Sequence, residues 1–154
     1  MPERPFTTFN FKINLQLEGE SSTLAGAEFS ECDGLEMTME PKTIREGGGN
    51  GRPIHLPGPV SYGQLTLKRG MTTGFDLWSW FERTQVERGL RASGEVLVLS
   101  SDRTREDLRF VLTGCLPVKV KAPSLSAADG AVAIEELQVA YETLHLATAE
   151  EAQA

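Results

Sequence analysis

The sequence predicts a mainly β fold, a small antiparallel β-barrel or sandwich with one short α-helix near residues 73–85. Three observations lead to this prediction. Apolar and polar residues alternate along several short segments, which is the period of a half-buried strand. Only one stretch clearly has the spacing of an amphipathic helix. The length of 154 residues suits a single domain, so residues 1–154 are expected to form one unit.

The first expected strand covers residues 9–17, where apolar residues alternate with polar ones at Phe9, Phe11, Ile13, Leu15 and Leu17. Two more alternating segments, at residues 27–29 and 35–39, flank Asp33-Gly34. This dipeptide favours a tight turn or bulge, which would connect the two segments locally. Further strands are expected at residues 64–69, 96–99, 108–112 and 118–121. The last of these is short and rich in lysine, which suits the edge of a sheet.

The helix is expected near residues 73–85. Thr73 can cap its first turn, and Asp76 suits the positive end of the helix dipole. Phe75, Trp78 and Phe81 recur at helical spacing and form the expected packing face. So much aromatic surface predicts a helix that lies across a barrel mouth or wall.

The segment 133–146 fits two structures. Ile134, Leu137 and Tyr141 have helical spacing, whereas Leu137, Val139 and Tyr141 alternate as in a strand. Helix propensity favours the first. Periodicity alone therefore leaves helix or strand open. The small and acidic residues 148–154 are expected to fray.

Residues 43–61 combine a glycine run with several prolines. Gly47, Gly48, Gly49 and Gly51 leave the backbone free to adopt positive φ, and the prolines that follow stiffen the return path. A phosphate-binding loop needs Gly-Lys followed by Ser or Thr, but here Arg52 follows Gly51. We therefore expect a flexible loop that becomes ordered on contact with a neighbouring molecule.

Other candidate chemical sites lack supporting residues. The two histidines, His55 and His145, do not have the spacing of zinc ligands. Cys32 and Cys115 lack a CxxC or catalytic signature, so both thiols are expected to be reduced and buried. Neighbouring carboxylates are interpreted as solvated strand faces at Glu31, Asp33, Glu135 and Glu136. The sequence therefore predicts a protein that is not an enzyme and binds no cofactor or metal.

Charge and hydropathy argue against two classes of partner. The formal net charge of −7 argues against nonspecific binding to nucleic acid or to an anionic membrane, since both need clustered Lys and Arg, and no specific nucleic-acid partner is expected. No apolar run approaches the roughly 20 residues of a membrane-spanning helix, and the first residues do not resemble a secretory signal. We expect no membrane anchor and synthesis in the bacterial cytoplasm.

Several segments together are similar to one known family. They read FSECDGLEMTME from Phe29, REGGGNG from Arg45, then LPG, YG, LTLKRG and LWSWF, and finally AIEELQVAYETL from Ala133. Over roughly residues 6–146 the chain resembles the tail-tube proteins of contractile phage tails and bacterial contractile injection systems. The resemblance implies a long barrel strand at residues 133–146, and we follow it there.

The resemblance also implies a function. Family members form hexameric rings that stack into a hollow inner tube, which is driven out when a sheath contracts. A small antiparallel sheet has exposed edges that another copy can pair with, which agrees with ring formation. Residues 43–61 would then reach the adjacent ring, with contacts at Arg45, Glu46, Gly47, Gly48, Gly49, Asn50, Gly51 and Arg52. The implied partners are the sheath, the baseplate hub or spike, the tube cap and protein cargo in the lumen of the assembled particle.

Two alternatives are kept. An insertion near Glu18–Thr23 and a compact glycine-loop motif depart from the commoner family pattern, so the chain could instead form the initiator ring at the baseplate. From another class, a monomeric ligand-binding β-barrel could use Trp78, Trp80 and Tyr62 against an apolar ligand. An enzyme with an unrecognised site is the weakest option.

Overall fold

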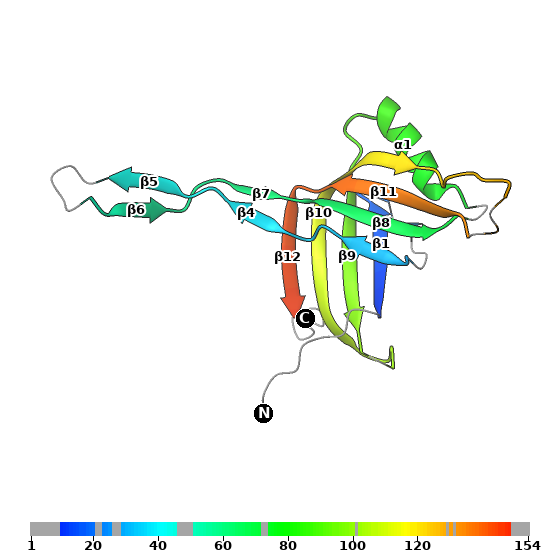
Figure 1. Cartoon of the computed structure of the whole chain (residues 1–154), viewed down its shortest axis with the longest axis horizontal. Helices are drawn as coiled ribbons and strands as arrows, with labels where there is room; N and C mark the ends of the chain where they lie inside the picture. Colours follow the sequence, from blue (N-terminus) through cyan, green and yellow to red (C-terminus); the bar gives the residue numbers. More distant parts are fainter. Residues whose placement is uncertain are drawn as a thin grey trace.

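One long strand, β10 (Glu106–Lys121), connects two parts of the main sheet, and these parts lie across each other in the computed structural model (Figure 1). The structure describes residues 10–20, 23–25, 29–45, 51–71, 74–100, 102–128, 130 and 132–148. The strands of the main sheet are β1 (Phe11–Leu17), β2 (Thr23–Ala25), β3 (Glu31–Asp33), β8 (Gln64–Gly70), β9 (Ala92–Leu99), β10 (Glu106–Lys121), β11 (Ile134–Ala140) and β12 (Thr143–Thr148). They are antiparallel in the order β2-β1-β9-β10-β11-β8-β3, and β12 also pairs with β10.

The bend lies within β10. Its first part pairs with β9 and β12, and its last part pairs with β11. The pairing with β9 shifts register between Leu112 and Cys115, where Gly114 has a φ of 62°. Such a bulge turns a strand without ending it. The two strands predicted at 108–112 and 118–121 are therefore one strand. Among the described residues, its last part, which holds Lys119 and Lys121, pairs only with β11 and so lies at an edge, as the lysines predicted.

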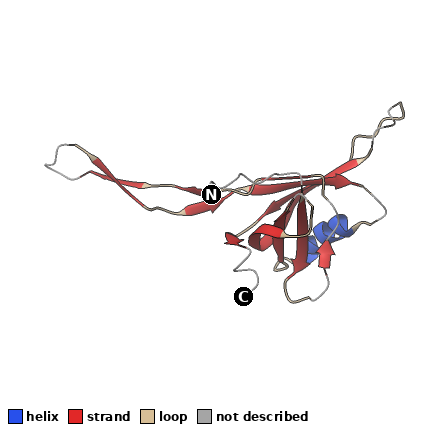
Figure 2. Ribbon diagram, turned by 90° about the horizontal axis from the view of Figure 1, so that it is seen from below, coloured by secondary structure: helices blue, strands red, loops and turns tan. Residues whose placement is uncertain are grey.

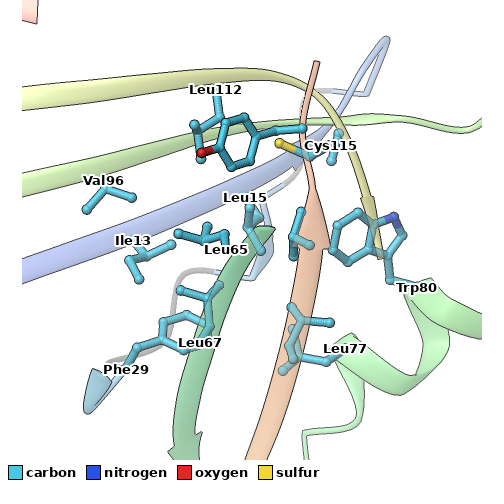
Figure 3. Packing of buried hydrophobic residues seen from close by; sticks show 14 of the residues in the cluster. Ile13, Leu15, Phe29, Leu65, Leu67, Leu77, Trp80, Val96, Leu112 and Cys115 are labelled. Atoms are coloured by element: carbon cyan, nitrogen blue, oxygen red, sulfur yellow. The ribbon is translucent and has the colours of Figure 1, made fainter. Parts of the chain in front are cut away.

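The core fills the space between the two parts of the sheet (Figure 3). Alternation predicted the first strand correctly: Ile13, Leu15 and Leu17 are buried on β1, while Phe9 lies outside the described residues. The buried cluster also includes Phe29, Leu65, Leu67, Leu77, Trp80, Val96, Leu112, Cys115, Leu137 and Val139. The predicted mainly β, antiparallel fold with one helix is confirmed. Of the two forms expected, barrel or sandwich, a closed barrel is not found: in the described part of the chain no strand pairing joins β3 to β2 or β12, and the sheet is open and bent.

The predicted helix is present as α1 (Asp76–Val86), which contacts β10 and β2. Its packing face differs from the predicted one. Leu77 and Trp80 are buried, whereas Phe75 is 56% exposed. Trp78 and Phe81 are half-buried beside that face. The reason is that the helix begins at Asp76, so Phe75 is the capping residue outside the first turn, and Thr73 lies outside the described residues.

The ambiguous segment 133–146 is β-structure, and the helical alternative is wrong. It forms two strands rather than one long strand. The chain turns at Tyr141 and Glu142, so that β11 pairs with the last part of β10 and β12 with the first part. Fraying was expected for residues 148–154. Thr148 is instead the last residue of β12, and residues 149–154 lie outside the described residues.

A narrow two-stranded ribbon projects from the body (Figures 1 and 2). We call residues 37–62 the ribbon. Its inner half pairs β4 (Met37–Met39) with β7 (Val60–Tyr62), and its outer half pairs β5 (Lys42–Arg45) with β6 (Pro53–Leu56). The predicted local turn at Asp33-Gly34 does not pair its flanking strands, because β3 pairs with β8 and β4 with β7. Gly34 instead directs the chain out of the sheet into the ribbon.

Gly34 combines a positive φ with no room for a side chain. Its φ is 103°, and a Cβ there would lie 1.9 Å from the backbone oxygen of Gln64. We expect Gly34→Ala to lower the free energy of unfolding by about 3 kcal/mol, because backbone strain and overlap with backbone atoms add. Gly19 is the matched control: its φ is 84° but its Cβ would meet nothing within 4 Å. Urea denaturation of both alanine variants separates the two causes, and equal losses would contradict the steric argument.

Candidate assembly surface

The inner half of the ribbon has one apolar and one polar face. Residues opposite each other in an antiparallel pair share a face. Met37 lies opposite Tyr62 and Met39 opposite Val60, so these four residues form the apolar face. Thr38 and Ser61 lie opposite each other between them and form the polar face.

The outer half repeats this division. Ile44 lies opposite Ile54, and Leu56 lies opposite Lys42 on the same face. The other face carries Thr43, Arg45, Pro53 and His55. Thr43 Oγ1 lies 3.4 Å from His55 Nδ1, so the polar face has its own cross-strand contact. Each half of the ribbon therefore presents one apolar surface.

These apolar surfaces are exposed to solvent in the single chain. The exposed fraction is between 41% and 61% for Met37, Met39, Ile44, Ile54, Leu56 and Val60. A two-stranded ribbon has only marginal stability on its own in water. Contiguous apolar surface on a soluble protein marks an interaction site. The ribbon thus has the properties of an interaction surface.

Tyr141 anchors the base of the ribbon to the body. Its hydroxyl accepts a hydrogen bond from the backbone N–H of Glu36 at 3.1 Å and donates one to the carbonyl of Gly34 at 2.8 Å. Its ring lies 5.7 Å from that of Tyr62. In the sequence, Tyr141 stands in the ambiguous segment 133–146, and nothing in its pattern indicates that it anchors the ribbon. The anchor fixes the direction in which the ribbon leaves the sheet.

The structure describes three of the eight predicted contact residues. Arg45, Gly51 and Arg52 lie exposed towards the outer end of the ribbon, and Gly51 has a φ of 70°. Glu46, Gly47, Gly48, Gly49 and Asn50 lie outside the described residues. The predicted loop at residues 43–61 is largely paired strand in its described part.

A buried charged cluster, which sequence analysis missed, joins β8, β11 and α1. Arg69 Nε donates to Glu135 Oε1 at 2.6 Å, and Trp78 Nε1 donates to Glu135 Oε2 at 3.0 Å. Arg69 also pairs with Asp76 at the start of the helix. Glu135 was predicted to be solvated but is only 1% exposed, because it shares the core-facing side of β11 with Leu137 and Val139.

The charged cluster positions α1 on the sheet. Burial lowers the pKa of Arg69, but hydrogen bonds with Asp76 and Glu135 outweigh it and the net shift is upward. Arg69 therefore stays charged, with its guanidinium carbon 5.4 Å from the centre of the Phe29 ring. Trp78 acts here as a hydrogen-bond donor, which the predicted packing role did not include.

The described residues hold no arrangement suited to metal binding or thiol chemistry. No group of three or more His, Cys, Asp or Glu side chains comes together among them. Burial, and for Cys32 also Asp33, raises the pKa of Cys32 and of Cys115 to about 12, so both thiols stay protonated at neutral pH. No helix among the described residues could cross a bilayer.

The residues proposed for a ligand-binding barrel make other contacts and do not line the groove that the structure describes. Trp80 lies in the core, Trp78 is bonded to Glu135, and Tyr62 packs on Tyr141. The groove that the structure does describe lies beside the first residues of β11, between Lys68, Lys121 and Ile134.

Comparison with known families decides the identity. The sequence profile of the T4-like virus tail tube protein gp19 family matches residues 7–145. The chain belongs to this family. The match spans the ribbon and the charged cluster, and it confirms the resemblance seen over residues 6–146. A search of curated protein sequences found no match.

Solved structures show the tail tube fold in related assemblies. A chain of the anti-feeding prophage (AFP) baseplate, 6-fold symmetrised, has 24% identity and a TM-score of 0.82, over 97% of this chain and 99% of that one. A chain of the AFP tube-terminating cap has 17% identity and a TM-score of 0.82, over 96% and 94%. A chain of the sheath-tube complex of the PVC extracellular contractile injection system, in the extended state, has 16% identity and a TM-score of 0.80, over 95% and 93%.

Proposed function

We propose that this tail tube protein is a structural subunit of the hollow inner tube of a contractile injection system or phage tail. Six copies close into a ring, and the rings stack into a conduit that sheath contraction propels. The observation that carries the proposal is the projecting ribbon, whose apolar surfaces need a cover that the single chain does not provide. The subunit itself performs no chemistry.

Free strand edges support lateral closure. In the described part of the chain, β12 pairs only with β10 and β3 only with β8, so each leaves one edge unpaired. Leu146 on β12 is also 52% exposed. Unpaired edges bind other strands readily. Pairing between the edges of neighbouring copies would close a ring, and the ribbon would then connect one ring to the next.

The proposed partners follow from the assemblies in which this fold occurs. Related folds are found in structures of a baseplate, a sheath-tube complex and a tube cap. We infer that this subunit contacts a sheath protein, a baseplate hub or spike, and a cap, around a lumen that can hold protein cargo. It would be made in the bacterial cytoplasm and then enter the assembled particle.

The proposal is tested by the assembly state of the purified chain. Size-exclusion chromatography with light scattering should give a species of about six subunits or larger, and negative-stain images should show rings or tubes with a central hole. A protein that stays monomeric at high concentration and is absent from the particles of its host would overturn the proposal. Abundance in sheared particles then separates a main tube subunit from an initiator ring, which contributes few copies.

The tip of the ribbon has its own test. We expect deletion of residues 47–51 to leave folded subunits that no longer polymerise, because the tip would no longer reach the adjacent ring. Circular dichroism checks the fold, and negative-stain imaging checks the tubes. A five-residue deletion in the exposed loop at residues 124–128 is the control, and it should leave tubes intact. Normal tubes from the first variant would refute the role of the tip.

A further inference from the structure

The two halves of the ribbon carry opposite charges beside their apolar faces. Lys42, Arg45 and Arg52 lie exposed on the outer half, and Glu36 and Glu40 lie exposed at the two ends of β4 on the inner half. None of the ion pairs found among the described residues includes any of these five. Glu46 lies outside the described residues. Even when Glu46 is counted, the sequence from 42 to 56 has three basic residues, Lys42, Arg45 and Arg52, and one acidic residue.

Charge decides which surfaces of two copies can meet. If two outer halves packed their apolar faces together, Lys42 of one copy, which stands on that face, would lie close to Lys42 of the other. If inner halves packed together, their carboxylates would face each other. Like charges in contact disfavour a pairing, and opposite charges favour it and set its register. Only the contact of an outer half with an inner half brings opposite charges together while covering apolar surface on both.

We propose that the outer half of one ribbon packs its apolar face, Ile44, Ile54 and Leu56, on the apolar face of the inner half of a second copy, Met37, Met39 and Val60. Lys42 stands on the apolar face itself and lies against the carboxylates of the second copy. This inference rests on the proposed tube assembly, because it names the surface that receives the ribbon.

The contact repeats without closing on itself. Each ribbon gives its outer half to one neighbour and receives another outer half on its inner half, so the two sides of the contact use different residues. Such a heterologous contact continues in one direction. Ribbons would therefore overlap along the tube by half their length, and the anchor at Tyr141 would hold each inner half in place for the next ribbon.

Disulfide cross-linking between two proteins that each carry one introduced, exposed cysteine tests the contact. Both carry Cys32→Ala, and the buried Cys115 stays. Ile44→Cys subunits are mixed with Met39→Cys subunits that differ in mass by a tag, assembled and oxidised. We expect the mixed dimer to exceed both homodimers at least about fivefold, because the charge pattern disfavours like halves. The control mixes Thr43→Cys with Thr38→Cys, which lie on the polar faces, and should give little product.

The outcomes distinguish this inference from the function on which it rests. Suppose that rings or tubes form in negative stain but Ile44→Cys subunits cross-link mainly to each other, or the mixed pair cross-links no more than the control pair. Either result overturns the overlap of ribbons and leaves the proposed tube function standing. Absence of any assembly overturns both. A charge swap adds a second measurement: Glu40→Lys or Lys42→Glu should each raise the concentration needed for assembly about fivefold, and the double variant should restore it. If the double variant instead lost as much assembly as the two single variants together, this result would also overturn the overlap.

Discussion

Glu135→Ala is expected to lower the free energy of unfolding by about 3 kcal/mol and the melting temperature by about 10 °C. The variant removes the carboxylate that accepts hydrogen bonds from Arg69 and Trp78. Asp76 still pairs with Arg69, but that pair lies at the more exposed end of the cluster. The guanidinium is only 6% exposed and would lose half of its counter-charge in a place that water hardly reaches. Thermal unfolding followed by circular dichroism measures the loss.

Glu136→Ala is the matched control. This residue is next along β11, lies on the opposite face of the strand, and is opposite Lys68. Its removal should change the free energy of unfolding by no more than about 0.5 kcal/mol, as for most surface positions. The double variant Arg69→Met with Glu135→Leu should recover much of the loss, because an apolar pair has no charge to leave unpaired. If Glu135→Ala cost no more than Glu136→Ala, the cluster would have no role in stability.

The sequence does contain a sign of this charged cluster: each charged residue stands in phase with the buried residues of its strand. Leu65, Leu67 and Arg69 alternate in one phase, and Glu135, Leu137 and Val139 alternate in another segment. In each case the charged residue shares the face of buried residues, so each needs a partner in the core. The partners are 66 residues apart in sequence. Local patterns show the need for a partner but not which strand provides it.

The ribbon shows a second limit of local reasoning. Alternation at Met37 and Met39 predicted a strand with one apolar face, and the structure has that strand. The same pattern gave no sign that this face points away from the protein's own core. Alternation with a period of two residues indicates that one face of a strand is buried. The pattern is the same whether that face packs on the same chain or on another copy. This explains why elements were predicted better than their packing.

Bends are the third feature that short patterns miss. A bulge at Gly114 and the turn at Tyr141 distribute β10, β11 and β12 between two parts of one sheet. Each strand was expected from its own alternation, but the sharing of β10 depends on contacts between distant segments. The open sheet in place of a closed barrel follows from the same contacts, since the pairing path ends at β3.

The largest effect on assembly is expected from Ile44→Glu combined with Ile54→Glu. These residues lie opposite each other at the centre of the outer apolar face, and they are 47% and 41% exposed in the single chain. Covering two carboxylates with apolar surface would cost about 3 kcal/mol or more for each contact, which raises the concentration needed for assembly more than about a hundredfold. Sedimentation and negative-stain imaging at increasing concentration measure this shift.

Thr43→Glu with His55→Glu provides the matched control. These residues form the neighbouring cross-strand pair of the same two strands, one position away, but on the polar face. Both double variants add two carboxylates to the same strands, so a general effect of negative charge or of weaker strand pairing would appear in both. The apolar face alone is covered if only the first variant loses its tubes while both keep the circular dichroism spectrum of the parent. Loss of tubes in the second variant to the same extent would mean that the ribbon acts through its charge or its fold, and not through the exposed isoleucines.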